Sequence, residues 1–280
     1  DSYCYLGIEI HKSGTFALAR TELKKKAMRA LYGLKSTVNR SKLTFRSLAT
    51  LFDSLIKPII MYGAPIYTPD MHILHHIVKF AEDSPKISHT EFLRKLSQLE
   101  CEKTHLHFLK WSLGVNRKAS NIGVWGESGR YPLIYECINQ TTKYFQRAKN
   151  LNNESLVHLA FKEQEEMELD WYRKFKPILA LDPTFTNDHV TAFNTAKCHK
   201  SINNDSKPTE KENFLIHNGF KKRVPPQSIN PNQSRNFTPF VIIKKLKQKF
   251  KISWQSSMNA SRKLEFYRTL KASFTKESCL

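Results

Sequence analysis

The sequence predicts a mainly α-helical fold: a short N-terminal β-hairpin, a multi-helix bundle, and a partly disordered linker before C-terminal helices. Apolar residues recur at spacings of three and four over most of residues 19–180, whereas strand-forming residues and a turn signal open the chain. From 181 to 238 that periodicity fails, and Pro, Asn, Ser and Lys dominate. We therefore expect a hairpin at 1–18, a helical region at 19–180, a linker or long insertion at 181–238, and truncated C-terminal helices at 239–280.

Residues 3–17 predict the hairpin, because Tyr5 and Ile10 favour a strand and Ser13-Gly14 supplies a turn. Strands this short are marginal in water by themselves. We therefore expect the hairpin to pack against another part of the protein.

Two amphipathic helices are expected next. Residues 21–38 place one apolar row on a buried face. Ser41 is positioned to cap the second helix, and Pro58 is expected to interrupt it, leaving 58–67 as a buried connection. The residues expected to be buried are Leu23, Ala27, Leu31, Leu34 and Val38 in the first helix, and Leu48, Leu51, Phe52 and Leu55 in the second.

Residues 105–133 predict three helices joined by two tight corners. Gly114 follows an apolar helix directly, as a C-terminal cap with positive φ would, and Gly126 and Gly129 close a second helical piece. Pro132 can begin the third helix, where its missing N–H is tolerated. Such corners determine how the three helices cross.

The remaining helices follow from the same periodicity. We expect a short helix at 71–80, one beginning at Thr90, one at 132–151, and one at 155–176 whose second face is acidic. After the linker, Thr238-Pro239 is expected to begin a helix, and a final helix follows. Their expected apolar positions are Phe240, Ile243, Leu246, Phe250 and Trp254 in the first, and Leu264, Tyr267, Leu270 and Phe274 in the second.

The charge of the chain favours a polyanionic partner. Forty-five Lys and Arg oppose twenty-five Asp and Glu, a formal net charge of +20, and nucleic acid is the usual partner of such a chain. Five scattered cysteines without paired spacing support neither a disulfide framework nor a zinc site, so we expect an intracellular location, in the nucleus or the cytoplasm. No apolar run reaches the length of a membrane span, so no membrane partner is expected.

Several cations are candidates for contact with a phosphate backbone, which positions a duplex without reading its sequence. Arg130 has a possible structural role instead of phosphate contact, because it could fix the corner at Gly129 by pairing with Glu127. No metal site is expected at His72, His75 and His76, because no carboxylate or cysteine stands at ligand spacing beside them. The candidates are Lys24, Lys25, Arg29, Lys35, Arg40, Arg117, Lys118 and Arg130.

Several segments resemble one known family. Residues 108–115, 119–121 and 126–133 are similar to a segment downstream of the polymerase in non-LTR (LINE-like) retrotransposon reverse transcriptases. Residues 5–7, Tyr-Leu-Gly, resemble the primer-grip hairpin of these enzymes, and residues 58–63 resemble their Pro-Ile-Leu-x-Tyr-Gly block. The matches occur in the family's order, and the pattern Ser261-x-Lys263-Leu264-x-x-Tyr267 extends them toward the C-terminus.

The resemblance implies a fragment of an RNA-directed DNA polymerase. Its helical part would be the thumb, and Tyr5 and Gly7 would help to position the primer 3′ end. The partners implied are an RNA–DNA template-primer duplex and the missing fingers and palm. The chain contains no adjacent Asp-Asp, so the Mg²⁺ implied for the palm has no place here; no cofactor and no catalysis are expected of this fragment. Two alternatives stay open: a basic helical adaptor for acidic proteins, and a decayed transposon remnant.

Overall fold

A computed structural model describes residues 2–82, 88–183, 239–261, 264, 265 and 267. These residues are mainly helical and include one two-stranded antiparallel hairpin, as predicted. The predicted linker lies outside the described residues apart from 181–183, and so does most of the predicted final helix. Within the described part of the chain, no helix combines the length and the apolar character needed to cross a membrane.

The hairpin is real, but the predicted position of its turn is wrong. Strands β1 (Ser2–Tyr5) and β2 (Ile8–His11) pair with Tyr5 opposite Ile8, so Leu6 and Gly7 form a two-residue turn. Both turn residues have positive φ, 46° and 81°, which matches the twist of two paired strands. Gly14, also at positive φ, instead turns the chain toward the first helix.

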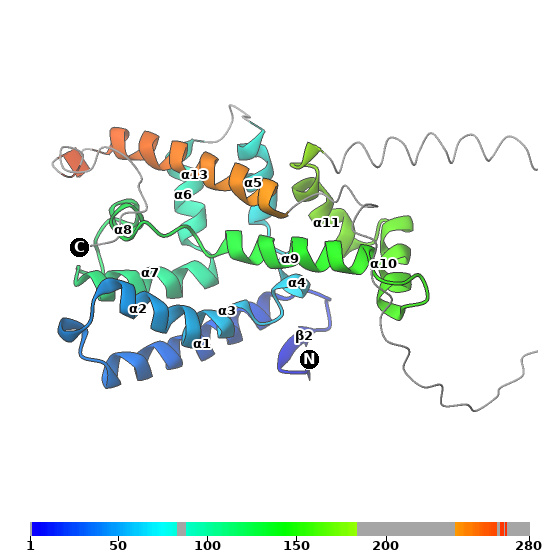
Figure 1. Cartoon of the computed structure of the whole chain (residues 1–280), viewed down its shortest axis with the longest axis horizontal. Helices are drawn as coiled ribbons and strands as arrows, with labels where there is room; N and C mark the ends of the chain where they lie inside the picture. The colour runs from blue at the N-terminus through cyan, green and yellow to red at the C-terminus, as the bar shows by residue number, and fades with distance from the viewer. Residues whose placement is uncertain (1, 83–87, 184–238, 262–263, 266, 268–280) are drawn as a thin grey trace, which may run out of the picture. The chain divides into compact units, whose positions relative to one another are not determined.

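Helix α1 (Ala17–Thr37) has the predicted apolar face and begins four residues earlier than predicted. Ala19, Leu23, Ala27, Leu31 and Leu34 are buried, whereas the predicted Val38 lies beyond the helix end and is only half-buried. This face packs against α3 (Lys57–Met61) and α7 (Glu100–Leu113) (Figure 1).

Pro58 does not interrupt the second helix, contrary to prediction. The chain remains helical through α2 (Phe45–Leu51), the π-helical turn η2 (Phe52–Ile56) and α3, with Pro58 at the second position of α3. A wider π turn accommodates a residue that has no N–H to donate. The extra residue in this turn shifts the buried face, so Ile56 is buried and Leu55 is 53% exposed.

The start of this helix and the segment after it also differ from prediction. Thr44, not Ser41, caps α2, its hydroxyl accepting a hydrogen bond from the Ser47 N–H at 3.2 Å. Ser41 lies instead within a 3₁₀ turn, η1 (Arg40–Lys42). The connection expected at 58–67 is helical at both ends: its first residues belong to α3, and α4 (Ala64–Tyr67) begins directly after Gly63, which has positive φ.

Helix α13 (Pro239–Ala260) packs along α6 (His89–Ser97) and α9 (Ile134–Lys149), and it also contacts α5 (Ile73–Ala81) (Figure 1). Its buried face begins at Ile242 and continues through Phe250 and Trp254, whereas the predicted Phe240 is 72% exposed. The Trp254 Nε1–H donates to the carbonyl of Ile122 at 2.8 Å. A helix far along the chain thereby completes the core of the earlier helices.

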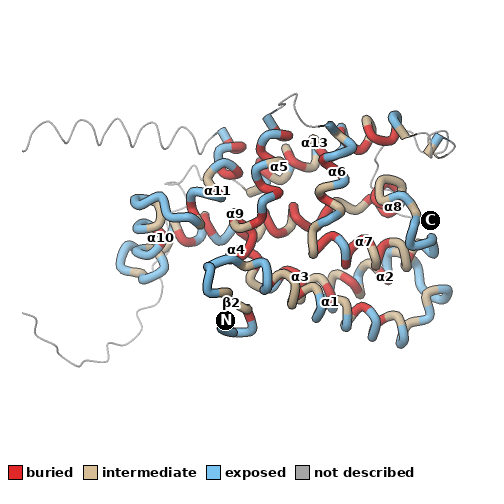
Figure 2. The backbone as a smooth tube through the Cα atoms, turned by 180° about the vertical axis from the view of Figure 1, so that it is seen from behind, coloured by how far each residue is buried: buried red, intermediate tan, exposed pale blue. Residues whose placement is uncertain are grey.

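The single helix predicted at 155–176 is two helices, α10 (Leu156–Glu166) and α11 (Asp170–Leu179). The break, where Glu168 has a φ of 46°, lets both helices place an aromatic ring on Phe145 of α9: Phe161 at 4.7 Å and Tyr172 at 5.9 Å between ring centroids. Figure 2 shows α10 exposed along most of its length, and Leu156, predicted to be buried, is 83% exposed.

Candidate nucleic-acid interface

The three predicted helices of the central stretch are α7, α8 (Asn121–Ser128) and α9. Gly114 and Gly129 end the first two with positive φ, 71° and 60°, as glycine caps do. Gly126 is not part of a corner. It lies inside α8, where a Cβ would come within 2.5 Å of the Trp254 ring, so its small size allows α8 and α13 to approach closely.

A buried glutamate holds the three helices together. The Glu102 side chain, fully buried in α7, accepts hydrogen bonds from His105 Nδ1 at 3.0 Å, Trp125 Nε1 at 2.9 Å and the Leu133 N–H at 2.8 Å. One carboxylate thus contacts α7, α8 and the start of α9. Sequence reasoning missed Glu102; the spacing of three between it and His105 is the only local signal.

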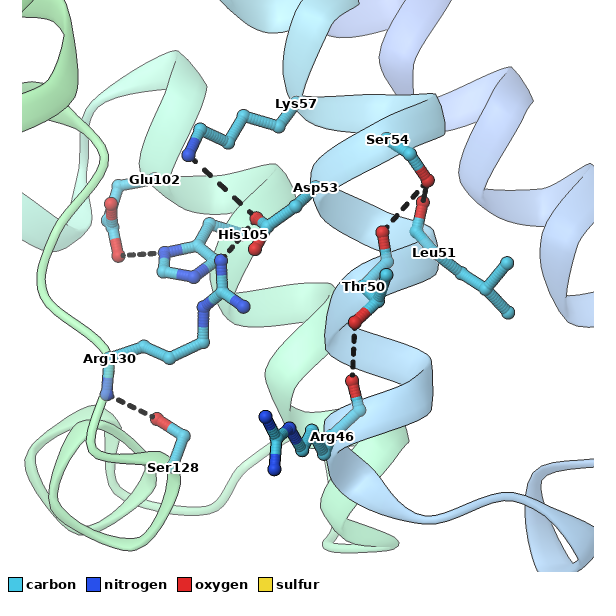
Figure 3. A network of polar contacts seen from close by, with 10 residues as sticks. All are labelled: Arg46, Thr50, Leu51, Asp53, Ser54, Lys57, Glu102, His105, Ser128 and Arg130. Carbon is cyan, nitrogen blue, oxygen red and sulfur yellow. Dashed lines mark hydrogen bonds and ion pairs between the residues drawn. The ribbon is translucent and has the colours of Figure 1, made fainter. Parts of the chain in front are cut away.

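Arg130 pins this corner to the π-helical turn. Its guanidinium pairs with the Asp53 carboxylate, while its backbone N–H donates to Ser128 Oγ at 3.4 Å (Figure 3). The guanidinium also lies 5.8 Å from the centroid of the Phe52 ring. Asp53 also lies 4.0 Å from Lys57 Nζ. The pinning role considered for Arg130 is therefore present, with Asp53 in place of Glu127.

A different surface gathers cations that pair with no carboxylate among the described residues. Helices α1 and α7 run side by side in the same direction: Lys24 and Cys101 line one small cavity, Lys35 contacts His107, and the Arg40 guanidinium lies against Gly114. Beside the pair is an open hollow of about 410 Å³, which follows α7 from Lys103 to Lys110 and which we call the α1–α7 pocket. Its lining residues are Tyr32, Ser97, Lys103, Leu106, His107, Lys110, Arg117 and Asn121.

Lys35 is held at the edge of this pocket among rings rather than carboxylates. Its Nζ donates to His107 Nε2 at 2.9 Å and lies 5.7 Å from the Tyr32 centroid and 5.6 Å from the Trp111 centroid. Burial, helped by the nearby Arg117 charge, lowers the pKa of Lys35 to about 8. Burial and the cations around His107 lower its pKa as well, so its ring is neutral at pH 7 and can accept this hydrogen bond.

Lys110 and Lys103 complete the cluster. Lys110 Nζ donates to the Arg117 carbonyl at 2.9 Å, and burial lowers the pKa of Lys110. Within the described part of the chain, Lys35, Lys103, Lys110 and Arg117 form no ion pair with a carboxylate. Sequence reasoning missed Lys103 and Lys110, although their spacing of seven places them on one face of a helix.

The other predicted cations are distributed around this cluster. Lys24, Lys25 and Arg29 precede it along α1; Lys25 also pairs with Glu22 at 2.6 Å. Lys118 is exposed in the connection between α7 and α8, next to Arg117.

The predicted hairpin residues lie apart from the pocket. Tyr5 is 57% exposed in β1, and Gly7 forms the turn of the hairpin, which precedes the N-terminus of α1. Lys35 lies eighteen residues beyond the first residue of α1, a rise of about 27 Å along a helix. The structure therefore does not bring the hairpin turn and the pocket together.

Two acidic residues of α10 and α11 pair with cations of their own helices. Glu166 pairs with Lys162 at 3.7 Å, and Asp170 pairs with Lys174 at 3.5 Å, each four residues away on its own helix. Their charges are thus compensated locally.

Neither a metal site nor a known relative indicates what the α1–α7 surface binds. Among the described residues, no group of three or more His, Cys, Asp or Glu side chains is arranged to hold a metal ion. Comparison of the chain with protein-family models, curated proteins and solved structures finds no match. The resemblance to retrotransposon reverse transcriptases therefore stays a prediction from the sequence.

Proposed function

We propose that this chain binds the phosphate backbone of nucleic acid along α1 and α7. We further propose that it is the primer-grip, thumb and downstream helical part of a non-LTR retrotransposon reverse transcriptase. The observation that carries the first proposal is the convergence of Lys103, Lys110 and Arg117 on one hollow, without a carboxylate partner in the described chain. Lys35 adds a further cation, because it contacts His107, which lines the same hollow.

Electrostatics explains why such a cluster favours an anionic ligand. Bringing cations together and partly burying them raises their free energy, as the lowered pKa of Lys35 indicates. A phosphate group placed among them would offset both the mutual repulsion and the lost hydration. The net charge of +20 adds a long-range attraction for any polyanion.

The length of α1 suits a nucleic-acid strand. Its 21 residues extend about 31 Å, a distance that spans roughly nine phosphates of one strand. Cations distributed along a helix face contact the sugar-phosphate backbone rather than the base edges. We therefore expect binding without strong sequence preference.

The part that this binding would play follows from the sequence resemblance. In the intact enzyme the helices would hold the RNA–DNA template-primer, and Tyr5 and Gly7 would help to position the primer end. The fingers and palm, with the aspartates that bind Mg²⁺, would be supplied by other parts of the polymerase. The fragment alone is expected to bind and not to polymerise.

Fluorescence anisotropy with a labelled RNA–DNA duplex tests this proposal. The test variant carries Lys24→Glu, Lys25→Glu and Arg29→Glu. The control variant carries Lys79→Glu, Lys143→Glu and Arg147→Glu, which change the net charge equally at exposed positions on α5 and α9. We expect the α1 variant to lose at least about tenfold more affinity than the control, and its salt slope to fall by about 0.9 for each phosphate that it no longer neutralises.

Three outcomes would contradict the proposal. Affinity that does not decrease between about 50 and about 200 mM salt would exclude phosphate contacts as its basis. Equal losses in the two variants would mean that net charge, not the α1 surface, attracts the duplex. Binding to polyglutamate as tightly as to the duplex would favour the alternative of a basic adaptor for acidic proteins.

A further inference from the structure

The α1–α7 pocket contains more than a phosphate backbone requires. Besides its cations it is lined by two rings, Tyr32 and His107, and by the polar side chains of Ser97 and Asn121. Contacts along a duplex backbone need cations and hydrogen-bond donors only. Exposed rings beside cations are typical of sites that hold an unpaired base, because the base stacks on a ring while its phosphate meets a charge.

Tyr32 lies where a bound strand would arrive. Lys25, Arg29 and Tyr32 follow one another at spacings of four and three and so share one face of α1. The Tyr32 ring is half exposed, and its centroid lies 5.8 Å from the centroid of the His107 ring, which meets it edge to face. A cationic row along the helix thus ends in an aromatic ring at the opening of a hollow.

We propose that this pocket binds a single unpaired nucleotide, with its base against Tyr32 and its phosphate between Lys110 and Arg117. This inference rests on the proposed binding of nucleic acid along α1. The hollow of about 410 Å³ is within the range of pockets that hold ligands of this size. Asn121 offers a donor and an acceptor to a base edge, and Ser97, whose hydroxyl donates to the Arg94 carbonyl, offers an acceptor. A base paired within a duplex is stacked and cannot enter.

The ligand class is therefore a nucleic acid with a single-stranded end or gap. A blunt duplex can contact the lysines of α1 but cannot fill the pocket. A duplex with a short single-stranded overhang can do both, so the protein should distinguish these two ligands through Tyr32.

The experiment compares the affinity of the full chain for a blunt RNA–DNA duplex with its affinity for the same duplex carrying a short overhang. We expect the overhang to raise affinity about tenfold, the contribution of one stacked base. Tyr32→Ala should abolish this difference, whereas Tyr32→Phe, which keeps the ring, should preserve it. Tyr144→Ala, which removes an exposed tyrosine on α9, is the matched control.

A second readout reports the stacking itself. An overhang that carries 2-aminopurine should lose fluorescence on binding to the wild-type chain, because stacking quenches this base, and should keep it on binding to the Tyr32→Ala variant. The inference is overturned if wild-type protein binds both duplexes equally, or if Tyr32→Ala retains the difference; phosphate binding along α1 would survive either result. Failure to bind both duplexes would overturn the proposed function as well.

Discussion

Replacing Glu102 should destabilise the chain more than replacing any exposed glutamate. The carboxylate is fully buried and accepts hydrogen bonds from His105, Trp125 and Leu133, so Glu102→Ala leaves three donors without an acceptor. Each buried donor left unsatisfied costs about 1 to 3 kcal/mol, which makes the expected loss about 3 to 9 kcal/mol. Because a folded domain is stable by only about 5 to 15 kcal/mol, this change removes much of the free energy of unfolding.

Glu102→Gln provides a graded version of the same test. The amide keeps one acceptor oxygen but brings an NH₂ group to the position of the other, so about one donor loses its partner, and the expected loss is about 1 to 3 kcal/mol. Glu163→Ala is the control, since this exposed residue of α10 forms no ion pair within the described residues.

Urea unfolding followed by circular dichroism measures all three variants. We expect Glu102→Ala to be least stable, Glu102→Gln to be intermediate, and Glu163→Ala to lie within about 0.5 kcal/mol of the wild type. A loss below about 1 kcal/mol for Glu102→Ala would show that the buried carboxylate does not hold the three helices together.

Two further predictions concern the helices that form the pocket. Gly114→Ala should destabilise the protein by about 1 to 2 kcal/mol, because Gly114 has a φ of 71° and the Arg40 guanidinium occupies the space of a Cβ. Gly33→Ala, at an open position near the C-terminal end of α1, should stabilise it by about 0.5 to 1 kcal/mol. Chemical denaturation measures both stability changes, and changes of the same sign in the two variants would contradict this expectation. Lys35, with its pKa lowered from 10.5 to about 8, binds fewer protons in the folded chain than in the unfolded chain between these values. Its contribution should therefore raise stability as the pH rises through this window, and Lys35→Met should show a smaller rise than the wild type in urea titrations at about pH 7.5 and about pH 10.

Local periodicity predicted most of the helices. The apolar rows of α1 and α9 and the glycine caps at Gly114 and Gly129 depend on residues three or four apart, whose positions on a helix follow from the sequence alone. The net positive charge also follows directly from the composition. These features determined the fold class.

The details that failed depend on neighbours distant in the sequence. Leu156 is exposed because α10 and α11 bend back to place Phe161 and Tyr172 on Phe145, which a straight apolar row cannot indicate. The π-helical turn that precedes Pro58 shifted the buried face by one residue and exposed Leu55.

The sequence determined that the chain is helical and basic, and only the tertiary structure decided which cations act together. Lys35 of α1 contacts His107 of α7, which lies 72 residues later in the sequence. Arg130 is also basic, but it pairs with Asp53 at a different site. The physical reason is that charge interactions depend on distance and burial in three dimensions. Apolar spacing along one helix determines which face is buried, but not which helix will cover it.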